Sequence, residues 1–361
     1  MIITRKLLLT AGLMATMVLS NSANSASNAD EKLGYEPERN VLGHPNLQGV
    51  WDFRTITPFE RPLELGGKAK FADQEEEEAF RKSRLQATNV DLNRDKIPAK
   101  FDIEAAHNDF WMDFGTVMTE DGRTSLIIDP PNGRLPELTD KAKAQMVAGQ
   151  LRLPPVRDYW SLGIDSSKFY PAGPENLGLS ERCLVSQNAG PPIVPAAYNN
   201  NLRIVQAGDH IVLYTEMIHN ARIIYTDGRP HLPAEIQNWK GDSRGHWEGD
   251  TLVIETTNFT SKIPTVQLPV NLIDISKNGG VGAGDLMHVE ERFTRISETR
   301  LAYQYTVTDL STLAQPYTVA LLMRATDDQM YEYACHEANY AVSNILKGAR
   351  RAEKEPASTE N

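Results

Sequence analysis

Apolar and polar residues alternate with a period of two through the second half of the chain, from residue 202 onward. A strand places successive side chains on opposite faces, so this alternation predicts β-strands with one apolar face. Polar turns of a few residues separate these stretches, which predicts β-hairpins. The expected hairpins pair 210–217 with 222–226, 246–247 with 251–259, 288–296 with 300–308, and 317–325 with 330–335.

Consecutive hairpins of this kind make an antiparallel meander within residues 201–351, which end in a helix at 340–351. A meander leaves two unpaired edges unless its first and last strands meet, so an up-and-down β-barrel is the expected fold. A β-sandwich is the alternative. The expected fold class is therefore mainly β, followed by a polar, disordered tail at 352–361.

The stretch 27–200 is rich in turns and helices, and it contributes strands near 48–55 and 123–129. A polar, acidic run predicts a helix at 74–85. A second helix is expected after Thr139, with either Thr139 or Asp140 as its cap. We expect these elements to be helical and loop-rich insertions around the barrel.

The chain opens with the three-part layout of a secretory signal peptide. Arg5 and Lys6 precede an uncharged run of about 14 residues, Leu7 to Ser20, and small and polar residues follow. A membrane-spanning helix needs ~20 apolar residues, and no later stretch reaches that length. We therefore expect residues 1–26 to be a cleaved signal peptide, the mature protein to be periplasmic or secreted, and the chain to have no membrane span.

Acidic residues outnumber basic ones, 48 to 37, which gives a formal net charge of -11 at pH 7. Nucleic-acid binding requires a basic surface, so a nucleic-acid partner is not expected. Hydrophobic residues make up 40% and charged residues 24% of the chain. That balance is typical of a folded globular protein and excludes collagen-like and mostly disordered chains.

Cys183 and Cys335 are the two cysteines of the chain. In an oxidising compartment an even number of cysteines favours disulfide formation, so we expect a Cys183–Cys335 bond. Two inert, buried thiols are the alternative interpretation.

Several segments carry a resemblance to known proteins. Gly49-Val50-Trp51 is similar to the Gly-x-Trp start of lipocalin-type (calycin) barrels. The segments RTSLIIDPP (123–131), GDSRGHWEGDTL (241–252) and YACHEANY (333–340) together resemble an uncharacterised family of exported bacterial proteins. This resemblance covers most of the chain after the leader. It implies export and a calycin-like barrel, and it implies no particular activity.

Two segments imitate catalytic motifs but lack the required context. Residues 241–245 (GDSRG) fit Gly-x-Ser-x-Gly, a motif that needs a strand before the serine and a helix after it. Here a strand follows, so we expect a polar turn instead. His336-Glu337 begins like the zinc motif His-Glu-x-x-His, but Tyr340 stands at the position of the second histidine.

The eight histidines of the chain show no spacing that gathers three metal ligands locally. We therefore predict no cofactor. A metal ion such as zinc or iron could be bound only if the fold brings imidazole and carboxylate groups together from distant parts of the chain.

The candidate catalytic residues surround the turn between the strands expected at 210–217 and 222–226. Glu216, His219 and Arg222 supply a carboxylate, a titratable imidazole and a fixed cation, whereas turns usually select residues for backbone reasons. We expect the three to project together at one rim of the barrel. His219 would act as general acid or base and Glu216 would orient it, while Arg222 or Arg229 would stabilise negative charge.

A buried charge needs partners, so further polar residues on and beside the strands are expected to line a cavity. The candidate substrate-binding residues are Asp227, Arg229, His231, Glu255, Tyr331 and His336. The expected function is an exported barrel protein that acts on or binds a small organic molecule in a polar-rimmed cavity. Acid–base chemistry of the lyase, isomerase or hydrolase kind fits these residues. The alternatives are a non-catalytic carrier of a small apolar ligand and an envelope interaction protein.

Overall fold

The computed structural model describes residues 35–89, 91–96, 108–147, 171–268, 279–282, 284–337 and 339–354. The expected signal peptide (1–26) and most of the expected tail lie outside these residues. The helices are α1 (Gln74–Thr88), α2 (Asp140–Val147) and α3 (Tyr340–Ala352). The strands are β1 (Gly49–Asp52), β2 (Ile127–Asp129), β3 (Asn201–Ala207), β4 (His210–Thr215), β5 (Asn220–Tyr225), β6 (Asp242–Glu248), β7 (Thr251–Thr257), β8 (Val266–Leu268), β9 (Gly279–Val281), β10 (His288–Arg295), β11 (Arg300–Thr308) and β12 (Tyr317–Ala325).

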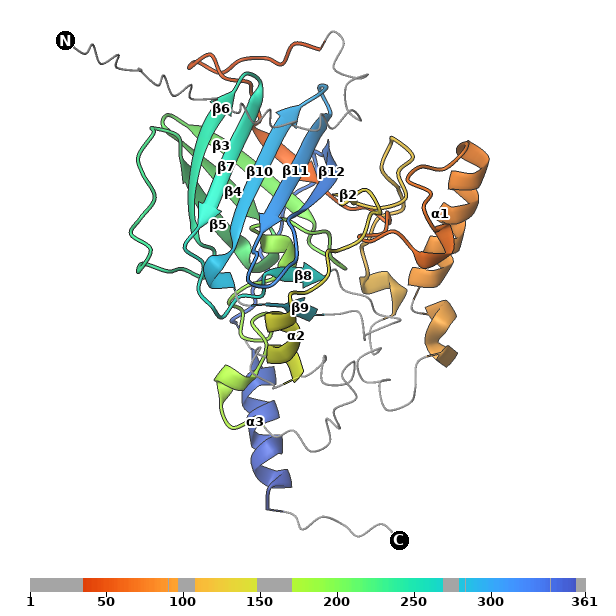
Figure 1. Ribbon diagram of the computed structural model, residues 1–361, viewed down its shortest axis with the longest axis vertical. Coiled ribbons are helices and arrows are strands. Elements are labelled where there is room, and N and C mark those ends of the chain that lie inside the picture. Colours follow the sequence, from red (N-terminus) through yellow and green to blue (C-terminus); the bar gives the residue numbers. More distant parts are fainter. Residues whose placement is uncertain are drawn as a thin grey trace, which may run out of the picture. The chain divides into compact units, whose positions relative to one another are not determined.

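Nine of the described strands close into a β-barrel (Figure 1). Their order is β1, β3, β4, β5, β6, β7, β10, β11 and β12, and β12 returns to β1 through the pair Trp51 and Ala325. The first residues of β12 use the same edge to pair with β2, where Thr318 faces Asp129. The expectation of a closed, mainly β, mostly antiparallel barrel is confirmed.

The alternation of apolar and polar residues decides which side chains face the interior. On β10 and β11 every second residue is buried while its neighbours are half-buried. The buried residues of these two strands are Val289, Glu291, Phe293, Leu301, Tyr303, Tyr305 and Val307. Three expected hairpins are present as β4–β5, β6–β7 and β10–β11, each with antiparallel pairing.

The meander is interrupted between β5 and β6, which run parallel and share a single residue pair, Tyr225 and Arg244. The connection 226–241 therefore returns past the barrel before β6 begins (Figure 1). β6 starts at Asp242, so residues 242–245 of the GDSRG segment lie in a strand and the expected polar turn there is wrong. The expected purely up-and-down arrangement is therefore wrong, because β5 and β6 are parallel.

The expected hairpin between 317–325 and 330–335 does not form. β12 already pairs with β11 along one edge and with β2 and β1 along the other, so no edge is left for a returning strand. Residues 330–334 instead run without regular secondary structure. The backbone N–H of Tyr331 donates to the carboxylate of Glu216 at 2.9 Å, which fixes this segment beside the β4–β5 hairpin.

The segment 188–197 is buried throughout and packs against the barrel interior. Ile193 belongs to the main hydrophobic core, and its backbone N–H donates to the hydroxyl of Tyr303 at 3.0 Å. Ala189 packs against Met217 and Ile218 in the turn between β4 and β5. The chain itself therefore fills the interior near the end where β4 meets β5.

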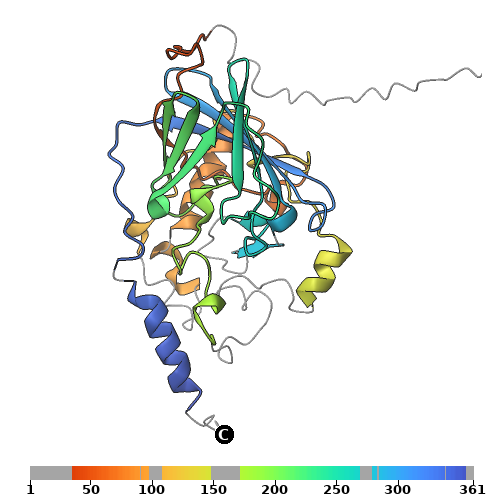
Figure 2. The same ribbon diagram turned by 90° about the vertical axis from the view of Figure 1, so that its left-hand side faces the viewer.

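Local signals explain where the helices begin. The side chain of Asp73 accepts a hydrogen bond from the N–H of Glu76 at 2.9 Å and caps α1. The hydroxyl of Thr139 accepts from the N–H of Ala142 at 3.1 Å and caps α2. Figure 2 shows α3, which begins at the expected Tyr340 and presents mostly exposed residues outside the barrel strands.

The predicted disulfide between Cys183 and Cys335 is confirmed, with the two Cα atoms 5.8 Å apart. Such bonds are typical of proteins in an oxidising compartment. Within the described residues, none of the helices has the length and apolar character needed to cross a membrane.

Candidate functional site

The turn between β4 and β5 holds two of the three predicted catalytic residues. Glu216 is buried, and its carboxylate accepts hydrogen bonds from the side-chain amide of Asn201 at 2.7 Å and from the backbone N–H of Tyr331. His219 is exposed and lies in the short 3-10 turn Met217–His219. Its Nδ1 lies 2.9 Å from the carbonyl oxygen of Tyr333.

The third predicted residue, Arg222, points into the barrel instead of toward the rim. Its guanidinium is buried and binds both carboxylate oxygens of Glu291, at 2.5 Å and 2.9 Å. Glu216, His219 and Arg222 thus each bind a different partner. The expected convergence of the three at one rim is absent from the described structure.

A buried hydrogen-bond network continues from this ion pair. The hydroxyl of Tyr303 donates to Glu291 at 2.7 Å and accepts the N–H of Ile193. Complete burial, together with the negative charge of Glu291, raises the pKa of Tyr303 well above its usual value. The phenol therefore stays protonated and holds the carboxylate in position for Arg222.

Two buried polar atoms beside this network have no hydrogen-bond partner among the described residues: the Nζ of Lys240 and the hydroxyl of Tyr305. Burial of the amine and the nearby positive charge of Arg222 lower the pKa of Lys240 to about 7. Burial raises the pKa of Tyr305. Unpartnered polar atoms in a protein interior are rare, which makes this pair notable.

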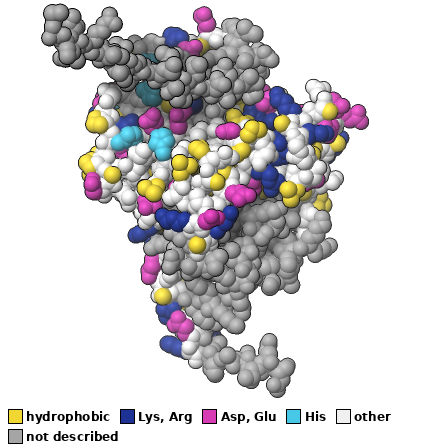
Figure 3. All heavy atoms as spheres, viewed as in Figure 1, with side chains coloured by type: hydrophobic (Ala, Val, Ile, Leu, Met, Phe, Trp, Pro, Cys, Tyr) yellow, Lys and Arg dark blue, Asp and Glu magenta, His cyan; other side chains and the backbone are white. Residues whose placement is uncertain are grey.

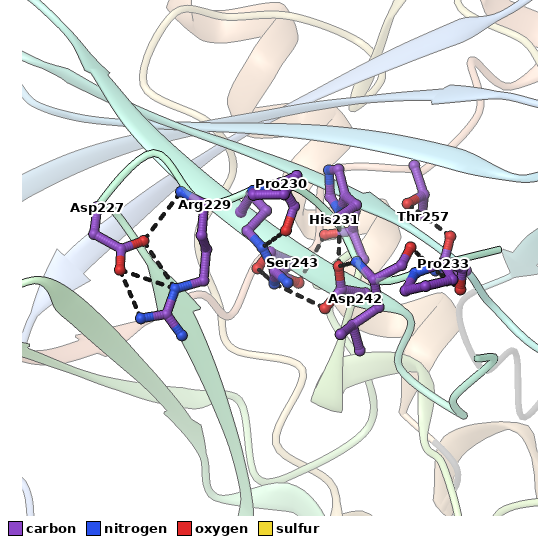
Figure 4. Close-up of polar contacts among 12 residues, drawn as sticks. Asp227, Arg229, Pro230, His231, Pro233, Asp242, Ser243 and Thr257 are labelled. Carbon is purple, nitrogen blue, oxygen red and sulfur yellow. Dashed lines mark hydrogen bonds and ion pairs between the residues drawn. The ribbon is translucent and has the colours of Figure 1, made fainter.

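A second polar network lies on the outer side of β6, where the connection 226–241 meets the strand (Figure 4). The Nδ1 of His231 lies 2.8 Å from one carboxylate oxygen of Asp242, which also accepts the N–H of Leu232 at 3.0 Å. The other oxygen of Asp242 binds the guanidinium of Arg244 at 2.7 Å. Arg244 also donates to the carbonyl of Pro230 at 2.9 Å.

This arrangement fixes the orientation of one imidazole. Asp242 is buried while the side chain of His231 is 27% exposed. A carboxylate can only accept a hydrogen bond, so the Nδ1 of the neutral ring carries the hydrogen and the Nε2 lone pair is available. An imidazole oriented by a carboxylate in this way is equipped to accept and return a proton.

Ser243 does not complete a hydrolase triad with this histidine. Its hydroxyl lies on the opposite, inner face of β6, 2.9 Å from the hydroxyl of Thr256. Neighbouring residues of a strand point to opposite faces, so the strand separates Ser243 from the contact between His231 and Asp242. The sequence expectation that GDSRG is no nucleophile motif agrees with this geometry.

The remaining candidate substrate-binding residues are dispersed. Asp227 and Arg229 form an exposed ion pair at 2.6 Å, with the guanidinium 3.8 Å from the ring centre of Tyr225. Glu255 lies on β7, with Arg244 and Glu290 as its cross-strand neighbours. Tyr331 and His336 are exposed. Figure 3 shows histidine side chains close together at the upper left of this face, while acidic side chains are scattered across it.

Sequence reasoning missed the partners that organise both networks. Glu291 is an acidic residue between Val289 and Phe293 on the buried face of β10, and that break in the apolar alternation is a signal of an interior ion pair. Asp242 lies in the GDSRG segment, where a polar turn was expected, so its contact with His231 was not predicted. Lys240 has no comparable sequence signal.

Among the residues that the structure describes, no group of three or more His, Cys, Asp or Glu side chains could hold a metal ion. The sequence matches no family model, and no curated protein shows significant similarity to it.

Proposed function

We propose that the protein is an exported barrel protein that acts on a small organic molecule by acid–base chemistry, with His231 as the residue that transfers the proton. The observation that carries this proposal is the 2.8 Å contact between the Nδ1 of His231 and the buried carboxylate of Asp242. Imidazole exchanges protons near neutral pH, and a carboxylate on Nδ1 stabilises the imidazolium formed when Nε2 accepts a proton.

The contacts favour His231 over His219 for this role. The Nδ1 of His219 faces a neutral carbonyl, that of Tyr333, which orients the ring but supplies no negative charge. Glu216, the residue predicted to assist His219, is already bound by Asn201 and by the backbone of Tyr331. The acid–base chemistry predicted from the sequence is therefore proposed at a different histidine.

Neighbouring groups support a substrate with an anionic or aromatic part. The guanidinium of Arg229 lies over the ring of Tyr225, and that of Arg244 lies 5.8 Å from the same ring. Although Arg229 is paired with Asp227, 44% of the Arg229 side chain is exposed to solvent. In this proposal Arg229 stabilises negative charge on the substrate, the role that the sequence suggested for Arg222 or Arg229.

The exported location and the calycin-like barrel type belong to the same proposal. The disulfide supports an oxidising compartment. Trp51 of the Gly-x-Trp segment is buried on the first strand, its indole N–H donates to the carbonyl of Leu47 at 2.9 Å, and Arg295 lies over its ring at 5.6 Å. The barrel differs from the eight-stranded lipocalin form by its ninth strand and its parallel β5–β6 pair.

The proposal is tested with p-nitrophenyl acetate, an ester whose hydrolysis is accelerated by an accessible basic imidazole. The His231→Gln variant should lose at least about tenfold of the rate above background, because general acid–base catalysis contributes roughly 10²–10⁴-fold. Long-range ¹⁵N NMR of the wild-type imidazoles should show the hydrogen of His231 on Nδ1, and Asp242→Asn should remove that preference.

His246→Gln is the matched control, because His246 on β6 has a half-exposed and more distant partner, Glu248 at 3.3 Å, so no buried carboxylate orients its ring. Its rate should equal that of the wild type. A His231→Gln protein that retains the full rate would refute the assignment. If His219→Gln loses the rate instead, the chemistry belongs to the β4–β5 turn.

A further inference from the structure

The junction between β5 and β6 is the weakest lateral contact in the described part of the barrel. The other neighbouring barrel strands are antiparallel and share at least two residue pairs, whereas β5 and β6 share only Tyr225 and Arg244. Arg222 lies on β5 before that pair, and Lys240 precedes β6 by two residues. The backbone hydrogen bonding between the two strands is therefore limited to one end of β5.

Lys240 places its amine at this junction. Lys240 is half-buried as a whole residue, while its Nζ is buried and has no hydrogen-bond partner among the described residues. The positive charge of Arg222, which is paired with Glu291, acts on this amine. Burial and that positive charge lower the pKa of Lys240 to about 7, so a large share of the amine is uncharged near neutral pH.

A second unpartnered donor begins β5. The side-chain amide nitrogen of Asn220 is buried and has no hydrogen-bond partner among the described residues. Asn220 and Arg222 lie two residues apart on one strand, so they belong to the same face. An amine and an amide N–H group without acceptors point to a ligand that supplies an oxygen atom.

We propose that the β5–β6 junction is a covalent binding site for small aldehydes and ketones, with the Nζ of Lys240 as the nucleophile. This site is independent of the proposed role of His231. An amine that is buried next to a fixed cation is a recognised form of activated lysine nucleophile. The unpartnered amide of Asn220 supplies a hydrogen-bond donor for the carbonyl oxygen of the ligand.

The chemistry needs no oxidant, reductant or cofactor. The nitrogen lone pair attacks the carbonyl carbon, the carbonyl oxygen takes up a proton, and the amine nitrogen loses one, which gives a carbinolamine. Loss of the hydroxyl group and the remaining N–H hydrogen as one molecule of water forms the imine. Lys240 is only partly buried as a whole residue, so the site lies near the surface of the protein.

The test is reductive trapping with propanal and sodium cyanoborohydride at pH 7, followed by peptide mass mapping. Lys240 should be alkylated at least tenfold faster than the exposed Lys262, which serves as an internal control in the same molecule. The rate at Lys240 should level off above about pH 7. Lys240→Arg should abolish the fast-labelled site and leave labelling at Lys262 unchanged.

Equal labelling of Lys240 and Lys262 in the folded protein would overturn the proposal, as would a Lys240 rate that still rises at pH 9. Asn220→Asp offers a second measurement, since it replaces the donor with an acceptor and should slow trapping at Lys240. The ester assay of His231 should be unaffected by Lys240→Arg, so failure of one proposal is distinguishable from failure of the other.

Discussion

Arg222 and Glu291 form a bidentate ion pair inside the barrel although they lie 69 positions apart in the sequence. The pair joins β5 to β10 across the interior, and the hydroxyl of Tyr303 binds the same carboxylate. A buried charge that loses its partner remains desolvated, so the two residues depend on each other energetically.

Removal of one partner should therefore destabilise the fold strongly. We expect Glu291→Gln to lower the free energy of unfolding by about 3–5 kcal/mol, measured by urea denaturation followed by circular dichroism. The double variant Arg222→Met/Glu291→Leu should recover much of the loss. Arg292→Met is the control, because its partner Glu248 is half-exposed and the change should cost about 1 kcal/mol or less. An unchanged Glu291→Gln protein would contradict the interior pairing.

The stability of the wild-type protein should rise between pH 7 and pH 9.5 through Lys240. Its pKa is about 7 in the folded protein, below the ordinary value of 10.5, so the unfolded chain binds the proton more tightly over this range. Raising the pH deprotonates the buried amine of the folded protein. The free-energy cost of burying its positive charge is thereby removed. Lys240→Met should be more stable than the wild type at pH 7, and the difference should shrink as the pH rises. Urea titrations of both proteins over this pH range measure the difference in unfolding free energy. A difference that does not change with pH would exclude a lowered pKa for Lys240.

The disulfide should contribute substantially to stability, because Cys183 and Cys335 are 152 residues apart in sequence. The chain-entropy model gives about 5 kcal/mol as an upper figure for a loop of that length, and measured losses are typically about 2–5 kcal/mol. The Cys183→Ser/Cys335→Ser protein should unfold at correspondingly lower urea concentration. Thiol titration of the unreduced, denatured wild type should find no free thiol, and two would disprove the bond.

Gly241 should be intolerant of a side chain. It has φ +66°, and an added Cβ would contact the carbonyl oxygen of Thr257 and lie 2.7 Å from the side chain of Thr256. We expect Gly241→Ala to cost more than about 2 kcal/mol in unfolding free energy. Gly249→Ala is the matched control, since Gly249 has φ +58° with open space around it and should lose only about 1 kcal/mol. Equal losses would show that backbone conformation alone matters.

Sequence reasoning succeeded where a pattern is local. The alternation and short turns predicted the β10–β11 hairpin, and Asp73 and Thr139 capped helices near the expected positions. The parallel contact of β5 with β6 was missed because no local pattern tells a strand which distant edge it will meet. The same limit applies to the site.

For the candidate site, the residue types in the sequence identified several polar residues of the two networks. They did not identify the residues that bind them in the folded protein. The hairpin residue Arg222 was singled out for its charge, but its partner Glu291 lies on β10 and is reached only through the closed barrel. His231 was named among the binding residues, whereas its orienting carboxylate, Asp242, becomes visible only once 226–241 folds back onto β6. Burial of Lys240 likewise depends on how the connection 226–241 packs against the folded barrel.

The pair of Trp51 and Ala325 that closes the barrel has a consequence for the order of folding. These residues are about 270 positions apart, and contacts between such distant parts of a chain form slowly. During synthesis β1 and β3 can pair long before β12 has been made. The other edge of β1 therefore stays unpaired until β12 is available. An open edge of this kind is prone to intermolecular pairing. Pulsed hydrogen exchange during refolding should therefore protect the amides of the β10–β11 hairpin earlier than those of the β1–β12 contact.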